Sequence, residues 1–364
     1  MKIDFANLGL AYQEHKENID AAMSDVLNKS SFIMGPIVLE LEDRLSNFVG
    51  VKHSISCASG TDALLLAMMA VDIQPGDEII TTPFTFIATA ETIAFLKAKP
   101  VFVDIDEKTY NIDSSKIEEA ITDRTKAIMP VSLFGQVSNM LEINKIAEKH
   151  NLIVIEDAAQ SFGATYENKK SCNLSHIACT SFFPAKPLGC FGDGGAVFTN
   201  DDELAEKIKS LRLHGQTKRY HHKYIGMGGR LDALQAAVLN EKLKHYNVDV
   251  SRRNNVALKY SELLKNHTII PFVEQDRTSV WAQYSIRVKN RSEIQESLKS
   301  LGIPTAVHYP VPLHLQECFN YLGGKQGDFP MAEKVSQEIM SLPMNPYLTE
   351  EEVEYISTNL IKLL

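Results

Sequence analysis

Cysteine is scarce in this sequence, and the few cysteines follow no metal-binding or disulfide pattern. The chain of 364 residues has five, and no two of them form a C-x-x-C pair. A disulfide-stabilised scaffold needs a denser set, and a structural zinc site needs paired ligands. We therefore expect a protein of the reducing cytoplasm, and we predict no metal site.

Apolar runs of membrane-spanning length and an excess of basic residues are missing too. The first 20 residues also lack the apolar core and the small-residue cleavage site of a signal peptide. The formal net charge is -9, which disfavours general nucleic-acid binding because phosphate backbones are held by basic surface. We expect neither a membrane nor a nucleic acid as a partner, so an anionic ligand requires a local basic pocket.

Short β-branched segments alternate with helical ones over the first 215 residues. The strings HSISC, DEIITTP, KPVFVDID, TKAIMPVSLFG, LIVIEDAA and IACTSFF read as strands, and GTDALLLAMMAV, FIATAETIAFLKA and DDELAEKIKSLRLHG read as helices. Such alternation predicts an α/β layered domain with a mainly parallel sheet.

The organisation changes after about Tyr246. A long charged helix is expected from roughly Leu231 to Leu264, and the following QYSIRVKNRSEIQESLKSLGIPTAVHYPV predicts strand, helix and strand. We therefore predict a large α/β domain with an N-terminal arm over residues 1–250 and a small C-terminal α+β domain over residues 251–364.

One lysine, Lys186 in SFFPAKPLGCFGDGGAVFTN, stands between Pro184 and Pro187 and before a glycine-rich turn. The residue before a proline is steered away from helical dihedral angles, so we expect Lys186 on a rigid, non-helical connection. An amine held in one place suits a Schiff base with a carbonyl or with pyridoxal phosphate. Taken alone, the stretch also fits a solvated loop lysine.

Two more strand ends carry polar groups, at the edge where open α/β sheets collect ligands. In SISCASGTDALL, Ser59 is a good N-cap, and the amides of Gly60, Thr61 and Asp62 at a helix start predict a phosphate site. In LIVIEDAAQSFGA, Asp157 ends an apolar strand, where a carboxylate suits a protonated pyridine nitrogen. The alternatives are an ordinary capped helix and a loop acid.

An ordered set of motifs resembles one family over nearly the whole chain. The motifs are SGTDAL, PFTFIATAE, VIEDAAQSFGA, TSFFPAKPLGCFGDGGA and GGRLDALQAAVL. They are similar to those of the pyridoxal-phosphate-dependent nucleotide-sugar aminotransferases. That resemblance implies the aspartate aminotransferase fold (fold type I), a three-layer domain with a mainly parallel sheet, and a homodimer with shared active sites.

The resemblance also implies a role for each matching position. Lys186 would bind pyridoxal 5′-phosphate covalently and move the proton, and Asp157 would pair with its pyridine nitrogen. The other cofactor-binding positions would be Gln160 near the phenolic oxygen, Phe86 stacked on the ring, and Gly60, Thr61 and Ser181 on the phosphate. Glutamate would convert the cofactor to pyridoxamine 5′-phosphate, which would then aminate the sugar.

Substrate recognition is expected to involve Arg230, His308 and Tyr309. The segment RLHGQTKRYHHKYIGMGGR is basic within an acidic protein, and Arg230 in it is our candidate for a bidentate carboxylate clamp. A solvated loop or a subunit contact is the alternative for this segment. His308 and Tyr309 lie in AVHYPVP, which matches a part of the family that borders the sugar site.

The strings SCNLSHIACTSFFPAKPLGCFGDGGA and GIPTAVHYPVPL further resemble the subgroup that aminates carbon 3 of UDP-2-acetamido-2-deoxy-3-oxo-glucuronate, with L-glutamate as donor, for bacterial surface polysaccharide such as lipopolysaccharide O-antigen. Ser132 fits this subgroup, since many other relatives carry His there. Gly228 departs from the family, which commonly has an Asn that reaches the cofactor phosphate of the neighbouring subunit. Alternatives are another nucleotide-linked keto sugar, C4-keto or dTDP-linked, and a non-enzymatic regulator that binds the cofactor or a sugar nucleotide.

Overall fold

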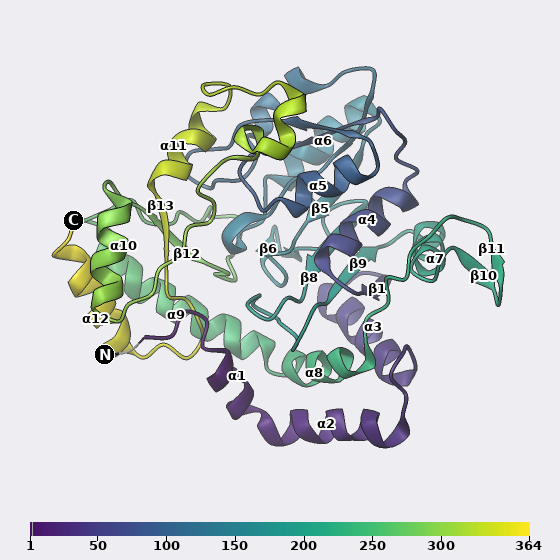
Figure 1. Cartoon of the computed structure of the whole chain (residues 1–364), viewed down its shortest axis with the longest axis horizontal. Coiled ribbons are helices and arrows are strands. Elements are labelled where there is room, and N and C mark those ends of the chain that lie inside the picture. The colour runs from purple at the N-terminus through teal and green to yellow at the C-terminus, as the bar shows by residue number, and fades with distance from the viewer. Residues whose placement is uncertain (2) are drawn as a thin grey trace.

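The computed structural model, which describes Met1 and residues 3–364, is built on one seven-stranded sheet (Figure 1). The strand order is β1-β9-β8-β5-β4-β2-β3. The strands are β1 (His53–Cys57), β2 (Glu78–Thr81), β3 (Lys99–Phe102), β4 (Thr125–Ile128), β5 (Ile153–Asp157), β8 (Ile177–Ser181) and β9 (Gly195–Thr199). The strands from β8 to β3 are parallel, and β9 is antiparallel to both β8 and β1.

Helices cover both faces of this sheet, because its strands bury side chains on both sides. Ile79 packs on one face and Ile80 on the other. The first face is covered by α4 (Gly60–Ala70), α5 (Ala88–Phe95) and α7 (Asp202–Leu211), and the second by α3 (Pro36–Val49), α6 (Met140–His150) and α8 (Ala233–Leu243). The predicted three-layer α/β class is confirmed.

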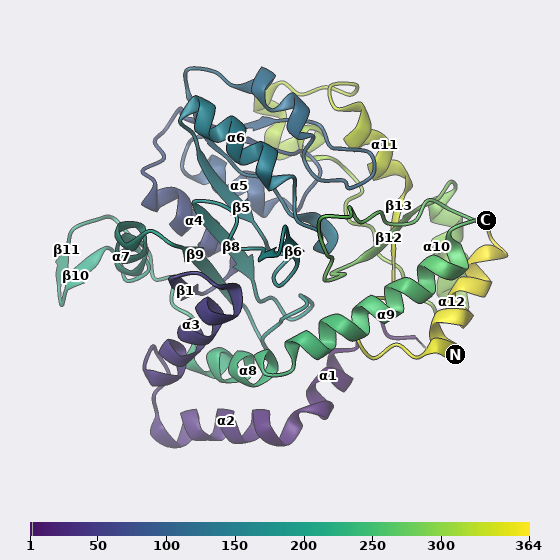
Figure 2. The same ribbon diagram turned by 180° about the vertical axis from the view of Figure 1, so that it is seen from behind.

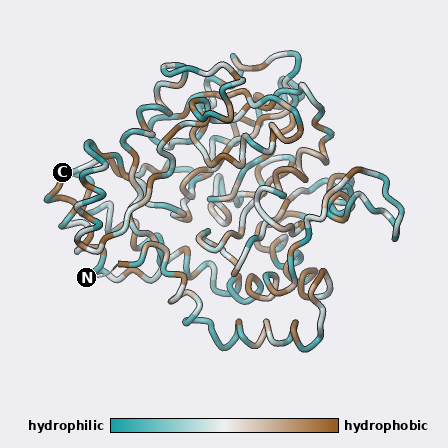
Figure 3. The backbone as a smooth tube through the Cα atoms, viewed as in Figure 1, coloured by the Kyte–Doolittle hydropathy of each residue, from teal (hydrophilic) through white to brown (hydrophobic). Residues whose placement is uncertain are grey.

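Shorter elements lie outside these layers. The N-terminal helix α1 (Leu8–Glu14) leads into α2 (Lys16–Lys29), which runs along the outside of α8, and the hairpin β10 (Gln216–Lys218) and β11 (His221–His222) projects from the body (Figure 2). A second small hairpin consists of β6 (Thr165–Tyr166) and β7 (Lys169–Lys170). In Figure 3 the projecting hairpin is mostly hydrophilic. Over the described part of the chain, no helix is both long enough and apolar enough to cross a membrane.

The C-terminal elements surround a core of their own. They are α9 (Tyr246–Leu264), β12 (Tyr284–Arg287), α10 (Arg291–Ser300), α11 (Pro330–Glu338), β13 (Ile339–Leu342) and α12 (Glu350–Ile361). Most of them bury side chains such as Tyr260, Leu298 and Leu342 in one apolar cluster. We propose that residues 1–250 and 251–364 act as two units, joined within the continuous helix α9.

Two local predictions for this region are wrong. The expected helix from Leu231 to Leu264 is two helices, α8 and α9, separated at Lys244 and His245. The stretch from Ile303 to Val311, predicted to be the second strand, forms only an isolated bridge between Ala306 and Ser341. The strand that pairs with β12 is β13. A strand partner so distant in the sequence leaves no local pattern from which it can be read.

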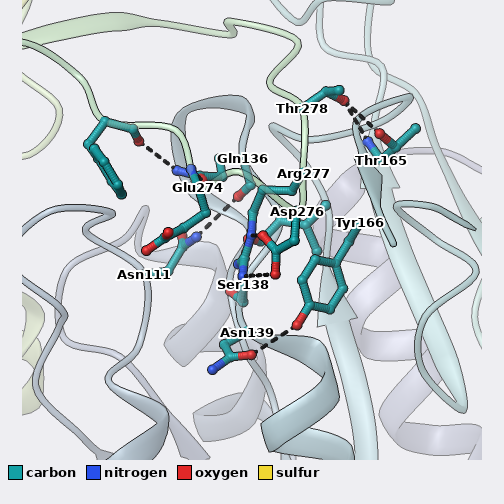
Figure 4. Close-up of polar contacts among 12 residues, drawn as sticks. Asn111, Gln136, Ser138, Asn139, Thr165, Tyr166, Glu274, Asp276, Arg277 and Thr278 are labelled. Atoms are coloured by element: carbon teal, nitrogen blue, oxygen red, sulfur yellow. Dashed lines mark hydrogen bonds and ion pairs between the residues drawn. The ribbon is translucent and has the colours of Figure 1, made fainter. Parts of the chain in front are cut away.

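Hydrogen bonds hold the segment after α9 against the loop that follows β4 and against β6 (Figure 4). The Gln136 Nε2 donates to the Phe272 carbonyl at 2.9 Å, and its Oε1 accepts from the Glu274 amide at 2.8 Å. Arg277 donates to the Val137 carbonyl at 2.9 Å. The Thr165 amide donates to Thr278 Oγ1 at 2.9 Å. These bonds fix the position of β12 relative to the large sheet.

A buried ion pair joins α3, β1 and the end of α7. The carboxylate of Glu42 accepts hydrogen bonds from the Ser56 amide at 2.9 Å, from Ser56 Oγ at 2.7 Å and from the Arg212 guanidinium. Arg212 and Glu42 are both buried. Because the chain turns from β1 into α4 just beyond Ser56, this pair braces the strand that ends at the predicted phosphate site.

Glu42→Gln is expected to lower the free energy of unfolding by about 3 kcal/mol, because it leaves the Arg212 guanidinium buried without its counter-charge. Urea unfolding followed by circular dichroism measures this loss. Glu40→Gln is the matched control, since Glu40 pairs with Arg44 on the same helix but is 51% exposed. Such exposed pairs contribute less than about 1 kcal/mol. Equal losses from both substitutions would contradict the role given to the buried pair.

Candidate active site

One pocket of about 520 Å³ lies where the carboxyl ends of β1, β5 and β8 meet. The chain beyond β1 gives Gly60 and Thr61, β5 ends in Asp157, and β8 ends in Ser181. Nine of the ten residues predicted to bind cofactor or substrate line it: Gly60, Thr61, Phe86, Asp157, Gln160, Ser181, Lys186, His308 and Tyr309. The fold therefore assembles positions spread over 250 residues of sequence.

Lys186 lies on a tight, non-helical connection after β8, as its proline neighbours predict. Its amide donates to the Phe183 carbonyl oxygen at 2.8 Å, which closes a turn. Burial lowers the pKa of the Lys186 amine, and the charge of Asp157 opposes this shift. A lowered pKa increases the fraction of neutral amine, which is the form that acts as nucleophile or base.

The Asp157 side chain is held by two hydrogen bonds at the end of β5. Its Oδ2 accepts from Thr89 Oγ1 at 2.8 Å, and its Oδ1 accepts from the Ala159 amide at 3.2 Å. Burial raises the pKa of Asp157, whereas these two hydrogen bonds and the charge of Lys186 lower it. The carboxylate and the amine thus stabilise each other's charged form inside the pocket.

The first turn of α4 forms a narrow cradle against the end of β8. Ser59 caps the helix, as predicted, by accepting a hydrogen bond from the Asp62 amide at 3.0 Å. A Cβ on Gly60 would lie 2.7 Å from the Cβ of Ser181, so only glycine fits there. The free amides of this turn and the Ser181 hydroxyl provide neutral donors for a phosphate.

Gln160 connects the large sheet to the C-terminal unit. Its Oε1 accepts from the Phe134 amide at 2.8 Å, and its Nε2 donates to Tyr309 Oη at 3.1 Å. One N–H of the amide remains for a ligand. The rings of Phe86 and Tyr309 are 6.1 Å apart at the same pocket wall, and Phe86 is 55% exposed toward the opening.

His308 is fixed by a chain of two buried serines. Its Nδ1 lies 2.9 Å from Ser341 Oγ, which lies 2.9 Å from Ser285 Oγ. Burial, together with the positive charge of Lys186, lowers the pKa of His308 to about 4. The imidazole is therefore neutral near pH 7, with its Nε2 free to contact a ligand.

Arg230 is the predicted site residue that does not line this pocket. It follows Gly229, whose carbonyl oxygen accepts from the Ala58 amide just before the cradle. Gly228 is crowded: a Cβ there would lie 3.1 Å from His214 Cε1. Ser132 also lies outside the pocket and donates to the buried Glu156 carboxylate at 3.0 Å.

Several pocket residues are missing from the sequence prediction. Thr85 and Thr89 line it beside Asp157, Gln283 comes from the C-terminal unit, and Asp193 lies near Asp62, whose pKa it raises in addition to burial. Thr85 and Thr89 belong to the motif PFTFIATAE, so this motif could have identified them as pocket residues. Nothing in the local sequence marks Gln283.

These residues fit pyridoxal phosphate. A half-buried lysine whose pKa is lowered, a buried carboxylate and a helix start that excludes even a methyl group match the aldehyde, the ring nitrogen and the phosphate of that cofactor. Within Met1 and residues 3–364, no group of three or more His, Cys, Asp or Glu side chains is arranged to hold a metal ion.

Residues 13–361 match the family model described as the DegT/DnrJ/EryC1/StrS aminotransferase family. The chain belongs to this family. A relative from Pseudomonas aeruginosa, UDP-2-acetamido-2-deoxy-3-oxo-D-glucuronate aminotransferase, is 53% identical over 97% of this chain and 98% of its own length.

Solved structures agree with this assignment. An aminotransferase of the same family from Brucella abortus superposes with a TM-score of 0.97 at 41% identity, with 99% of each chain covered. The structure of NtdA from Bacillus subtilis, with bound pyridoxamine phosphate, has a TM-score of 0.92 at 31% identity and covers 99% of this chain and 85% of its own. The predicted family, fold type, enzyme class and pyridoxal phosphate dependence are confirmed.

Gly60→Ala is expected to weaken binding of pyridoxal phosphate about tenfold or more, since its methyl group must displace Ser181. Titration of the apoprotein, followed by the fluorescence of Trp281, measures the dissociation constant. Gly9→Ala is the control, because no atom lies within 4 Å of a Cβ at Gly9. Unchanged affinity in Gly60→Ala would show that the cradle does not hold the phosphate.

His308→Gln is expected to remove part of the acid sensitivity of the apoprotein. The pKa of His308 is about 4 in the folded chain and about 6.5 in the unfolded chain. The unfolded chain therefore binds the proton first as the pH falls, and this lowers the stability of the wild type by about 2 kcal/mol between pH 7 and pH 5. Urea unfolding at both pH values tests this. An identical pH dependence in the variant contradicts it.

Proposed function

We propose that this enzyme transfers the amino group of L-glutamate to carbon 3 of UDP-2-acetamido-2-deoxy-3-oxo-glucuronate. The product would be UDP-2-acetamido-3-amino-2,3-dideoxy-glucuronate, made in the cytoplasm for a bacterial surface polysaccharide such as O-antigen. The observation that carries the reaction type is that the half-buried Lys186 and the buried Asp157 line one pocket. Similarity to the Pseudomonas relative along nearly all of both chains supports the substrate.

Lys186 acts as the base in both half-reactions. Its amine takes the proton from the α-carbon of glutamate in the first half-reaction, and in the second half-reaction it delivers a proton to carbon 3 of the sugar, which has no hydrogen as a ketone and gains one as the amine. Burial favours the neutral amine that this role needs. Pyridoxal phosphate, when bound, stores the amino group between the halves and withdraws electrons from the carbon that loses its proton.

Asp157 and Gln160 hold the cofactor ring in this scheme, and Gly60, Thr61 and Ser181 hold its phosphate. The ionised Asp157 keeps the pyridine nitrogen protonated, because the charged pair is favoured in a buried site. Phe86, which lines the same pocket, would pack against the cofactor ring. His308 and Tyr309, which border the same pocket, contact the sugar or the glutamate through neutral hydrogen-bonding groups.

Recognition of the diphosphate and carboxylate requires positive charge beyond Lys186. Among the described residues that line the pocket, Lys186 is the sole lysine or arginine. We propose a homodimer in which Arg230 and the exposed cations of the projecting hairpin, Lys218, Arg219 and Lys223, serve the pocket of the other copy. Arg212 is excluded from this role because Glu42 already pairs with it.

The visible absorption of the cofactor-loaded enzyme tests both substrate and reaction. Adding the expected product sugar should remove the band of the bound aldehyde form and release the keto sugar, identified by mass spectrometry. The band should also disappear with glutamate. Loss with glutamate but not with this sugar would retain the aminotransferase and reject the substrate, in favour of a C4-keto or dTDP-linked sugar tested in the same way.

Lys186→Ala is expected to lower turnover about a thousandfold or more, since it removes the base and the covalent attachment point. Steady-state assays with glutamate and keto sugar measure this. Multiple turnovers at a rate comparable to the wild type would show that Lys186 is not the base.

Arg230→Ala is expected to raise KM for the sugar nucleotide strongly. An experiment that mixes two impaired variants tests whether Arg230 serves the active site of the other subunit. In dimers formed from equal amounts of Arg230→Ala and Lys186→Ala chains, half are mixed and each mixed dimer has one intact site, so activity returns to about a quarter of the wild type. Activity no higher than that of the two variants alone would place Arg230 in the site of its own chain or outside it.

A further inference from the structure

Among the residues that the structure describes, Thr89 is the one whose side chain donates a hydrogen bond to Asp157. Thr89 Oγ1 lies 2.8 Å from Asp157 Oδ2, and the other carboxylate oxygen accepts only the Ala159 amide at 3.2 Å. Thr89 and Asp157 are both buried, at 1% and 5% exposure. Each carboxylate oxygen therefore has one fixed donor from the protein and keeps a lone pair for a further donor.

The Thr85 hydroxyl lies within hydrogen-bond distance of the Thr89 hydroxyl and can donate to its oxygen. The two hydroxyl oxygens lie 3.1 Å apart, one turn apart along the chain entering α5. An ionised carboxylate only accepts hydrogen bonds, so the single proton of Thr89 must point to Asp157. Thr85 must then be the donor to Thr89, and the chain runs in one direction, from Thr85 through Thr89 to Asp157.

This hydrogen bond matters most when Lys186 is neutral. Burial raises the pKa of Asp157, and three groups oppose it: Thr89, the Ala159 amide and the charge of Lys186. Lys186 must lose its proton to act as nucleophile or base, and its stabilising charge is lost with the proton. From this chain, Thr89 and the Ala159 amide then remain to favour the ionised carboxylate.

We infer that Thr89 is a positioning residue, whose hydroxyl keeps the Asp157 carboxylate ionised and aimed at the pyridine nitrogen of the cofactor. This inference rests on the role proposed above for Asp157. Thr89 itself donates to the carboxylate, so it acts through Asp157.

The test compares three variants of one helix by their affinity for two cofactors. Thr89→Val removes the hydroxyl at nearly constant volume, and Thr89→Ser restores it. Thr92→Val is the matched control, because Thr92 is buried one turn further along and donates only to the Ala88 and Thr89 carbonyl oxygens. The cofactors are pyridoxal phosphate and its analogue with carbon in place of the ring nitrogen.

Thr89→Val should weaken binding of pyridoxal phosphate about tenfold or more, as expected for a lost hydrogen bond to a charged group. It should change the affinity for the carbon analogue less than about threefold, because that ring offers no partner to the carboxylate. Thr89→Ser and Thr92→Val should bind both cofactors like the wild type. An equal loss for both cofactors in Thr89→Val would make Thr89 merely structural and overturn the inference.

Asp157→Asn separates this outcome from failure of the proposed function. If Asp157 pairs with the ring nitrogen, this variant also loses affinity for pyridoxal phosphate more than for the carbon analogue. A selective loss in Asp157→Asn without one in Thr89→Val would retain the role of Asp157 and reject that of Thr89. No selective loss in Asp157→Asn would reject the underlying assignment.

Discussion

The mutual stabilisation of the Asp157 carboxylate and the Lys186 amine is the interaction on which the site depends. Asp157 is buried and Lys186 is half-buried, and desolvation alone would drive both groups to their neutral forms. The surrounding chain offsets this cost unequally: Asp157 receives two hydrogen bonds, whereas the described contacts give the Lys186 amine only the opposite charge. The carboxylate is therefore the fixed partner, and the amine is the one that can change its protonation state during a reaction.

The position of these two groups follows from the sheet. Asp157 ends β5, and Lys186 lies on the connection that leaves its neighbour β8. Since β5 and β8 are parallel, their carboxyl ends meet at one edge of the sheet. Helices pack on both faces of the sheet and hold the two strands in place. The C-terminal unit closes the pocket with Gln283, His308 and Tyr309. Hydrogen bonds made by Gln136 and Arg277 hold that unit in a fixed position against the large domain.

Much of this architecture could be predicted from local sequence. Apolar β-branched runs indicated the strands, Ser59 indicated the start of α4, and two prolines indicated the turn at Lys186. What escaped prediction depends on distant contacts. The break between α8 and α9 has neither proline nor glycine to mark it, and β13 becomes a strand only because β12 lies beside it. Nothing in the local sequence distinguishes Thr89 from other helical threonines, because its contact with Asp157 forms only in the folded chain.

The crowding at Gly228 has a consequence for how related sequences can change. A Cβ there lies 3.1 Å from Cε1 of the exposed His214 ring, so an asparagine requires that ring to move by a few tenths of an ångström, or position 214 to become smaller. A chain that starts from the present pair passes through a less favourable state if position 228 changes first. Substitutions at the two positions are thus expected to occur in a preferred order, first at 214 and then at 228. The residue at 214 should indicate whether a given homologue can carry asparagine at 228.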